Sequence, residues 1–252
     1  MQPANNVPPV GLPFLQLQTV DSTNNYAMAL AHEGLARHGT VIFAHEQTKG
    51  RGQRTKQWLS QRGQNIIMSV VIEPASFNLF QKFYFNMAVA LGVHTFFYSY
   101  AGKETTIKWP NDIYWCDRKA GGILIENIIQ GAQWKYAIVG IGVNINQINF
   151  GDLANAISLK QITTKDYDVI ELAKELCAIL QAKILEMIVN PDSVINRYQN
   201  NLYKLGKVIR IKKNTRVFEA TIKGVTESGK LITKNGTEEV FDISEIEWLL
   251  DP

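Results

Sequence analysis

The stretch Ile113–Asn146, "IYWCDRKAGGILIENIIQGAQWKYAIVGIGVNIN", contains apolar runs separated by short polar breaks. The pattern predicts a strand, then a turn, and then a hairpin whose turn lies around Gln130–Gln133. A β-sheet that includes antiparallel strands is therefore expected in the middle of the chain.

Helices and strands are also expected on the N-terminal side of this stretch. Residues 21–34 begin with cap-forming side chains, continue with a helical pattern and end at a glycine, which predicts a helix. Residues 40–44 and 65–73 are apolar enough for buried strands, and the long apolar segment 77–100 predicts a core helix. A short strand in "TTIKWPND" is stopped by Pro110.

On the C-terminal side the expected secondary structure changes from helices to short strands. Residues 168–189 predict an amphipathic helix and residues 192–203 a shorter one. From about Lys204 the chain has short β-rich runs broken by "ESGK" and "KNGT", which are turn-forming. We therefore expect two domains, 1–203 and 204–252, the second being a small all-β unit of the size of an SH3-like barrel.

The composition is that of an ordinary globular protein, with 252 residues, 46% hydrophobic and 19% charged. A net charge of +3 implies no general affinity for nucleic acid or for an anionic membrane. Cys116 and Cys177 have no metal-ligand or redox spacing, and no metal-binding residues are identified. The start of the sequence lacks a signal-peptide pattern and no stretch predicts a membrane span, so a cytoplasmic location is expected.

The basic loop "TKGRGQRTKQW", residues 48–58, follows the first expected strand. It has four basic side chains, two glycines and no acidic residue, and it is part of about twenty residues without an apolar pattern. It matches neither the Walker A motif nor the dinucleotide fingerprint. An anion that binds from solution would explain such a loop, and a solvated charged turn is the alternative.

Two polar residues lie at the ends of the apolar runs in the opening stretch. Lys119, in "DRKAGGILIE", precedes two glycines that allow close backbone approach. With the basic loop and "KWPND", it makes a third positive element on the same sheet edge. Asn144, in "GIGVN", is either a strand-end cap or a ligand contact.

Taken together and in order, five motifs resemble those of the biotin–protein ligases. They are "DSTN" (Asp21–Asn24), "QTKGRGQRTKQW" (Gln47–Trp58), "KWPND" (Lys108–Asp112), "DRKAGGILIE" (Asp117–Glu126) and "GIGVN" (Gly140–Asn144). The resemblance spans the catalytic domain of that family and extends to its small C-terminal β domain. It implies an α+β fold, in which a mixed β-sheet with helices packed on it, like that of class II synthetases, is followed by an SH3-like β-barrel.

The resemblance implies an activity as well. Members of this family use ATP and Mg²⁺ to convert biotin to biotinoyl-5′-AMP and pyrophosphate. They then transfer biotin to a lysine of a biotin carboxyl carrier protein (BCCP) domain of a carboxylase, such as acetyl-CoA carboxylase. Because the carboxylate, the phosphates and the adenylate are all negative, the basic loop is expected to fold over them and keep water away.

Individual residues of this sequence receive roles from the resemblance. Lys119 and Arg54 would be the catalytic residues, with Lys119 stabilising charge at the biotin carboxylate and the α-phosphate. The candidates for binding biotin are Ser22, Thr23, Asn24, Gln47, Thr48, Arg51, Gly52, Gln53, Arg54 and Lys119. The candidates for binding ATP and the adenylate are Arg51, Arg54, Lys56, Trp58, Asn111, Asp112, Lys119 and Asn144.

The sequence departs from the family pattern in the loop and at its start. Lys49, Thr55 and Lys56 stand where many members have alanine or a second Gly-Arg, which affects loop kinetics and phosphate contacts. About twenty residues precede "DSTN", too few for the DNA-binding domain of the repressor members. A monofunctional ligase without specific DNA binding is expected, as a monomer or as a homodimer formed through the sheet.

Other function classes stay open. A lipoate or octanoate ligase-type acyltransferase has the same catalytic fold, but "GRGQR" is more arginine-rich than its binding loop. A non-enzymatic nucleic-acid-binding module would use the basic loop to hold phosphates, but the net charge is small and no basic stripe extends beyond the loop. A protein that binds biotinyl adenylate as a sensor, without catalytic activity, is a third alternative.

Overall fold

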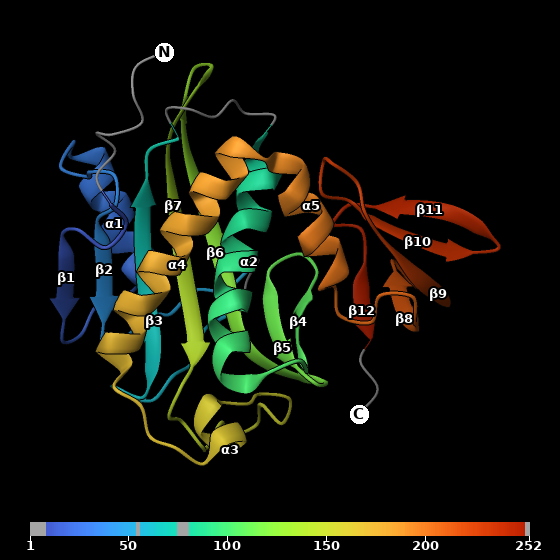
Figure 1. Cartoon of the computed structure of the whole chain (residues 1–252), viewed down its shortest axis with the longest axis horizontal. Helices are drawn as coiled ribbons and strands as arrows, with labels where there is room; N and C mark the ends of the chain where they lie inside the picture. Colours follow the sequence, from blue (N-terminus) through green and yellow to red (C-terminus); the bar gives the residue numbers. More distant parts are fainter. Residues whose placement is uncertain (1–8, 54–55, 75–80, 250–252) are drawn as a thin grey trace.

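The computed structural model describes residues 9–53, 56–74 and 81–249. A seven-stranded β-sheet forms the centre of its larger part (Figure 1). Its strands are β1 (Phe14–Leu17), β2 (Val41–Ala44), β3 (Asn65–Ile72), β4 (Thr105–Lys108), β5 (Asp112–Trp115), β6 (Arg118–Gln130) and β7 (Gln133–Asn144). They lie in the order β1-β2-β3-β7-β6-β5-β4. β1 and β2 are parallel and the other neighbours are antiparallel, so the sheet is mixed, as expected.

The hairpin predicted from the opening stretch is confirmed, and it lies in the interior of the sheet. β6 and β7 pair from Gly121 with Val143 to Gln130 with Gln133. Gly131 forms the turn with φ of +59°, a backbone conformation that glycine adopts without steric cost. Because the two strands pair over most of their length, the start of β6 and the end of β7 lie at the same end of the sheet.

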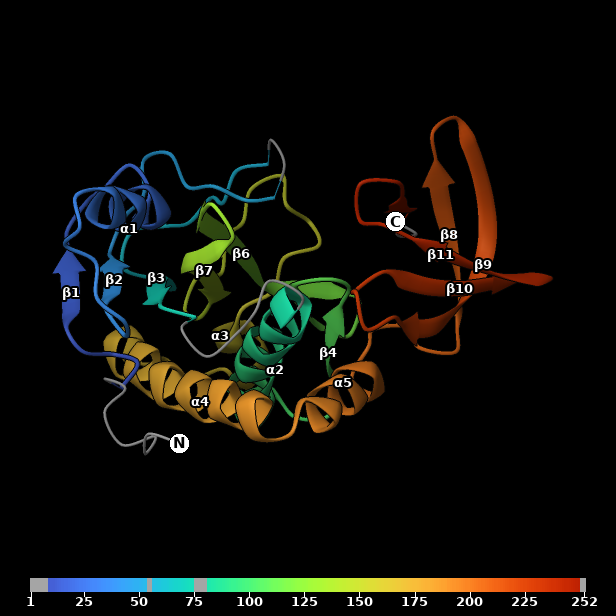
Figure 2. The same ribbon diagram turned by 90° about the horizontal axis from the view of Figure 1, so that it is seen from above.

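Helices cover both faces of the sheet. They are α1 (Thr23–His32), α2 (Lys82–Ala101), α3 (Leu159–Thr163), α4 (Val169–Val189) and α5 (Pro191–Asn200). Figure 2 shows α1 on one face and α2, α4 and α5 on the other. The main core lies under α2 and α4, where side chains such as Phe85, Phe96 and Leu180 are almost fully buried. A smaller core under α1 contains Ala27 and Ile138.

The expected helices are confirmed, with shifts at their ends. The apolar segment 77–100 becomes α2 from Lys82, and residues 77–80 lie outside the described residues. The shorter helix ends at Asn200, three residues before its expected end. β1 and α3 were not expected, because four or five residues are too few to show a clear period.

The C-terminal part forms a separate antiparallel sheet, which confirms the expected fold class. Its strands are β8 (Val208–Lys213), β9 (Arg216–Val225), β10 (Leu231–Asn235), β11 (Thr237–Phe241) and β12 (Glu247–Leu249), in the order β11-β10-β9-β8-β12. The turns predicted at "ESGK" and "KNGT" are confirmed, with Gly229 and Gly236 at positive φ. The domain boundary at 203/204 stays a prediction.

The second sheet packs against the edge of the first that carries β4 and β5 (Figure 1). The indole N–H of Trp109 donates to the carbonyl oxygen of Gly229 at 2.9 Å. The ring of Tyr203 lies between the rings of Tyr114 and Trp248, with centroid distances of 5.0 and 6.2 Å. Aromatic contacts of this kind favour a fixed arrangement of the two sheets. Within the described part of the chain, no helix combines the length and the apolar character that crossing a bilayer requires.

A buried histidine in α2 predicts a loss of stability in mild acid. Burial lowers the pKa of His94, whose Nε2–H donates to the Thr105 carbonyl at 3.0 Å. The unfolded chain therefore takes up more protons here, and stability present above the unfolded pKa of 6.5 is lost as the pH falls below it. We expect the free energy of unfolding, measured by urea titration, to decrease between about pH 7 and pH 5.

His94→Gln keeps a donor for the Thr105 carbonyl but cannot take up a proton. The decrease should therefore be smaller in this variant. His38, whose pKa burial also lowers, contributes equally in both proteins. An identical decrease in the two proteins would contradict the assignment.

Candidate active site

A cavity of about 560 Å³ lies where the N-terminal end of α1, the basic loop and strands β6 and β7 meet. The segment 150–156, which follows β7, supplies a further wall. A volume of this order is typical of sites for small molecules. Its two ends differ in chemistry, and they are called the polar end and the cationic end here.

The polar end consists of Ser22, Thr23, Asn24 and Gln47. The first three are between 1% and 3% exposed, and Ser69 beneath them is fully buried. The backbone N–H and the hydroxyl of Thr23 donate to Gln47 Oε1 at 2.8 and 3.1 Å. Ser22 occupies the N-cap position of α1, yet its hydroxyl makes no capping hydrogen bond. Polar groups buried at the end of a cavity suit a ligand with its own donors and acceptors.

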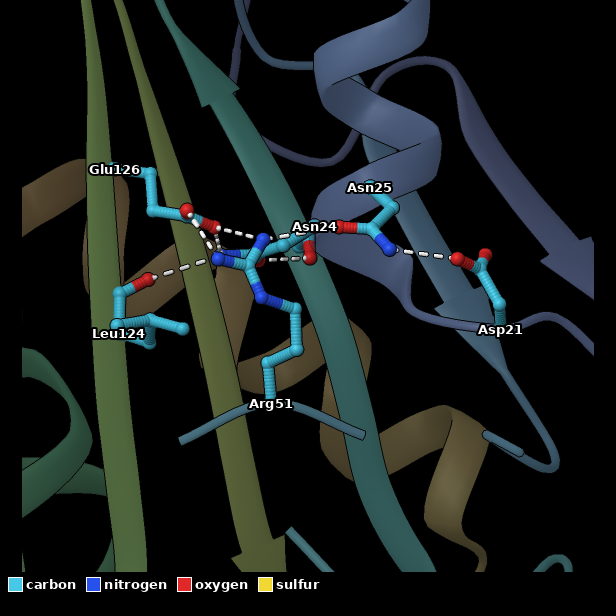
Figure 3. A network of polar contacts seen from close by, with 7 residues as sticks. Asp21, Asn24, Asn25, Arg51, Leu124 and Glu126 are labelled. Atoms are coloured by element: carbon cyan, nitrogen blue, oxygen red, sulfur yellow. Dashed lines mark hydrogen bonds and ion pairs between the residues drawn. The ribbon is translucent and has the colours of Figure 1, made fainter. Parts of the chain in front are cut away.

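A network of charged and amide groups joins the polar end to the basic loop (Figure 3). Arg51 Nη2 donates to Glu126 Oε1 at 2.8 Å, and Nη1 donates to Glu126 Oε2 at 3.1 Å and to Asn25 Oδ1 at 2.9 Å. Asn24 Nδ2 donates to the same carboxylate at 2.8 Å. Asn25 in turn donates to Asp21 at 2.6 Å. The loop is thus held to α1 through a carboxylate of β6.

The cationic end is built around Lys119. Its ammonium lies 2.7 Å from Asp112 Oδ1 and 5.9 Å from the centroid of the Trp58 ring. The backbone N–H of Lys119 donates to the Asn155 carbonyl at 2.6 Å, so the segment 150–156 fixes the backbone at this point. Lys56 also lines the cavity. Positive charge at this end is suited to a carboxylate or a phosphate.

A second lysine, Lys108, lies behind the cationic end and does not line the cavity. Its ammonium lies 3.3 Å from the Tyr114 hydroxyl and 5.6 Å from the centroid of the Trp248 ring. Burial lowers the pKa of Lys108 to about 8, against an opposing effect of Asp112. This lysine is the first residue of the "KWPND" motif.

Two candidate asparagines line the cavity, and their side chains also donate hydrogen bonds to backbone carbonyls. Asn144 is 4% exposed, and its Nδ2 donates to the carbonyls of Lys119 at 3.4 Å and Ile157 at 3.1 Å. Asn111 Nδ2 donates to the Ile123 carbonyl. For Asn144 these contacts favour the capping role that the sequence left open. Its placement also keeps Lys119 close to Ile157, the residue that follows the segment 150–156.

Two positions of β7 require glycine, because side chains from other elements pack directly against the backbone there. A Cβ atom on Gly140 would lie 2.9 Å from Asn24 Cγ, and one on Gly142 would lie 2.6 Å from Trp58 Cζ2. Real Cβ atoms essentially never come this close to a neighbouring atom. The "GIGVN" motif therefore makes room for Asn24 at one end of the cavity and for Trp58 at the other.

Most of the site residues predicted from the sequence come together around the cavity. Those that line it are Ser22, Thr23, Asn24, Gln47, Arg51, Gly52, Gln53, Lys56, Trp58, Asn111, Asp112, Lys119 and Asn144. Thr48 does not line it, and its backbone N–H donates to the Val20 carbonyl at 2.9 Å. Arg54 and Thr55 lie outside the described residues. Sequence reasoning also missed Glu126, Ser69 and the segment 150–156, whose partners are distant in the chain.

The described residues contain no group of three or more His, Cys, Asp or Glu side chains that could hold a metal ion. Two carboxylates, Asp112 and Asp152, line the cavity. One or two carboxylates are what a Mg²⁺ ion held mainly by substrate phosphates uses. Asp112, at the cationic end, and Asp152 are therefore donors of the kind that such an ion would use.

Comparisons with known proteins place the chain in a family and match its fold. The model of the biotin/lipoate A/B protein ligase family matches residues 17–144. A bifunctional ligase/repressor BirA of Bacillus spizizenii is 27% identical over 239 residues, which cover 92% of this chain and 73% of the relative. A biotin–[acetyl-CoA-carboxylase] ligase of Paracoccus denitrificans is 35% identical over 138 residues, covering 51% of this chain and 53% of the relative. The structure of the Aquifex aeolicus biotin protein ligase in complex with biotin and ATP has a TM-score of 0.73 at 25% identity, covering 94% of this chain and 95% of that one.

Proposed function

Because this chain belongs to the biotin/lipoate A/B protein ligase family, we propose that it is a biotin–protein ligase. It would activate biotin with ATP to biotinoyl-5′-AMP and pyrophosphate, and then transfer biotin to a lysine of a biotin carboxyl carrier protein domain. The relatives named for biotin ligation and the neighbouring structure with biotin and ATP support this proposal.

The buried polar end of the cavity is the observation that carries the choice of substrate. The ureido ring of biotin has two N–H donors and a carbonyl acceptor, which match Ser22, Thr23 and Asn24. The alkyl chain of octanoate and the dithiolane of lipoate have no comparable groups. Either would offer no partner to the Ser22 hydroxyl, which makes no capping hydrogen bond, or to the remaining acceptor capacity of Asn24 Oδ1, and leaving such buried groups unmatched is costly. The polar end therefore favours biotin over the substrates of the related acyltransferases.

The cationic end suits the chemistry of the first step. A carboxylate oxygen of biotin attacks the α-phosphorus of ATP, and pyrophosphate leaves with the electrons of the broken P–O bond. The carboxylate is ionised at neutral pH, so no general base is required. Lys119 would exchange its contact with Asp112 for contacts to the substrate carboxylate and α-phosphate, offsetting the charge that develops there.

The second step requires access for the acceptor and exclusion of water. The amine of the acceptor lysine attacks the acyl carbon, AMP leaves, and the amine loses a proton to solvent. The basic loop, with Arg51, Arg54 and Lys56, would cover the adenylate until the acceptor arrives. Mg²⁺, if held by Asp112 and Asp152, would neutralise phosphate charge.

A direct assay tests the proposal. The purified protein is incubated with ATP, Mg²⁺, an acceptor domain and either biotin, lipoate or octanoate, and acceptor modification is followed by mass spectrometry. We expect ATP-dependent transfer of biotin, with a preference over lipoate of about 10⁴-fold in kcat/KM. The reason is that a site built to hydrogen-bond a polar group rejects analogues that lack this group. Equal rates with lipoate or octanoate would favour the alternative acyltransferase.

A further inference from the structure

Glu126 of β6 contacts two predicted ligand-binding residues from two other elements (Figure 3). Asn24, on α1, is 102 positions away in sequence, and Arg51, in the basic loop, is 75 positions away. The side chain of Glu126 is 22% exposed, and Glu126 is not among the residues that line the cavity. It is therefore placed to act on a ligand through Asn24 and Arg51 and not by direct contact.

The contacts of Glu126 fix the orientation of Asn24. One face of the Asn24 amide donates, from Nδ2 to Glu126 Oε2 at 2.8 Å and to the Leu124 carbonyl at 3.3 Å. The other face accepts, because the Ser69 hydroxyl donates to Asn24 Oδ1 at 2.6 Å. An amide with acceptors on one side and a donor on the other has a single favourable orientation. Its remaining acceptor capacity therefore lies on Oδ1, at the polar end of the cavity.

The same carboxylate anchors the basic loop. Arg51 stands between two glycines, Gly50 and Gly52, so the backbone around it has little stiffness of its own. Three N–H groups of its guanidinium donate to Glu126 and Asn25. A guanidinium–carboxylate pair with two parallel hydrogen bonds constrains direction as well as distance. Loss of the carboxylate would release the loop at this point.

We propose that Glu126 is a positioning residue that sets the affinity for biotin by orienting Asn24 and by holding Arg51 over the polar end. The inference rests on the proposed function, because it concerns the biotin end of the same cavity. Glu126 takes no part in the chemistry, so its loss should change binding and leave the chemical step largely intact.

Glu126→Gln is the variant that tests this role. Glutamine has the shape of glutamate, but one of its two terminal groups is an NH₂ donor. Both neighbours, Asn24 and Arg51, present donors, so one contact becomes a donor–donor contact in the variant. We expect the KM and the dissociation constant for biotin to rise about ten-fold or more, with kcat within about three-fold of wild type. The KM for ATP should rise less than that for biotin, because Arg51 is a candidate for both ligands and Asn24 for biotin alone.

A matched control is provided by a second ion pair of the same loop region. Glu46 Oε2 lies 3.1 Å from Arg62 Nη1, and neither residue lines the cavity. Glu46→Gln should leave both KM values within about two-fold of wild type. Glu126→Asp keeps the charge with a shorter reach and should give an intermediate affinity, and thermal melting confirms that each variant is folded.

A rescue experiment separates orientation from a general structural effect. In the double variant Asn24→Asp with Glu126→Gln, the donor and the acceptor exchange places, so the contact between the two positions is restored. Its affinity for biotin should exceed that of Asn24→Asp alone, which places two carboxylates together.

The inference is overturned by a biotin affinity of Glu126→Gln equal to that of Glu46→Gln, or by a fall in kcat at unchanged KM. It is equally overturned by the absence of rescue. Calorimetric titration of the wild type with biotin and ATP distinguishes this from a failure of the proposed function. A wild type that binds neither ligand contradicts the function. If the wild type binds biotin and Glu126→Gln binds it equally well, only the positioning role is contradicted.

Discussion

Replacement of Lys119 by alanine is expected to lower the rate of pyrophosphate release from ATP and biotin by about 10²- to 10³-fold. The physical reason is the position of its ammonium at the cationic end, 2.7 Å from Asp112 and beside the Trp58 ring, where a carboxylate and a phosphate would meet. Removal of a charge that offsets transition-state charge lowers kcat.

The fold should survive this substitution. The backbone of Lys119 bonds to Asn155 and Ile157, and these bonds do not depend on the side chain. The ammonium is partly exposed, so the loss of its ion pair should cost about 1 kcal/mol of stability or less. Thermal melting of wild type and variant checks this expectation.

Lys160 offers a matched control for Lys119→Ala. It also forms a short ion pair, 2.6 Å from Asp166, and its side-chain exposure of 34% is close to the 35% of Lys119. It does not line the cavity. Lys160→Ala should leave the rate within about two-fold of wild type, and equal losses in the two variants would refute the special role of Lys119.

Replacement of either of two glycines of β7 by alanine is expected to weaken the binding of one substrate and not of the other. In Gly140→Ala the new methyl group displaces Asn24, so the KM for biotin should rise about ten-fold or more. In Gly142→Ala it displaces the Trp58 ring, so the KM for ATP should rise by a similar factor. Initial rates of pyrophosphate release at varied biotin and varied ATP measure both constants.

The two glycine variants serve as controls for each other. The residues are two positions apart on the same strand, and neither has a positive φ, so alanine brings no backbone strain at either place. Each variant should leave the KM for the other substrate within about three-fold of wild type. If both variants raised both constants alike, the assignment of the two ends of the cavity would be wrong.

Local sequence patterns were sufficient for most of the fold. The β6–β7 hairpin, the turns at Gly229 and Gly236 and the long helices α2 and α4 were all predictable, since each depends on a repeat of apolar residues or on a turn residue within one segment. β1 was not, because a four-residue edge strand has no period to read. Its partner β2 lies more than twenty residues further along the chain.

The candidate site was accessible from the sequence only through the order of its motifs. The motifs pointed to Lys119, Asn24 and Arg51, but not to the carboxylate that connects the last two. Glu126 ends a quoted motif, and nothing near it in sequence indicates its partners. The segment 150–156 carries no pattern, and it became part of the site through its backbone bonds to Lys119.

The sequence by itself determined the fold class, the family and the kinds of side chain available for the chemistry. Apolar periods, turn residues and motif order are local properties that the chain carries before it folds. Only the tertiary structure decided that the cavity has a polar and a cationic end, and that Glu126 links Asn24 to Arg51. Such contacts depend on strand register and on the packing of α1 against the sheet, which bring together groups 75 or more positions apart.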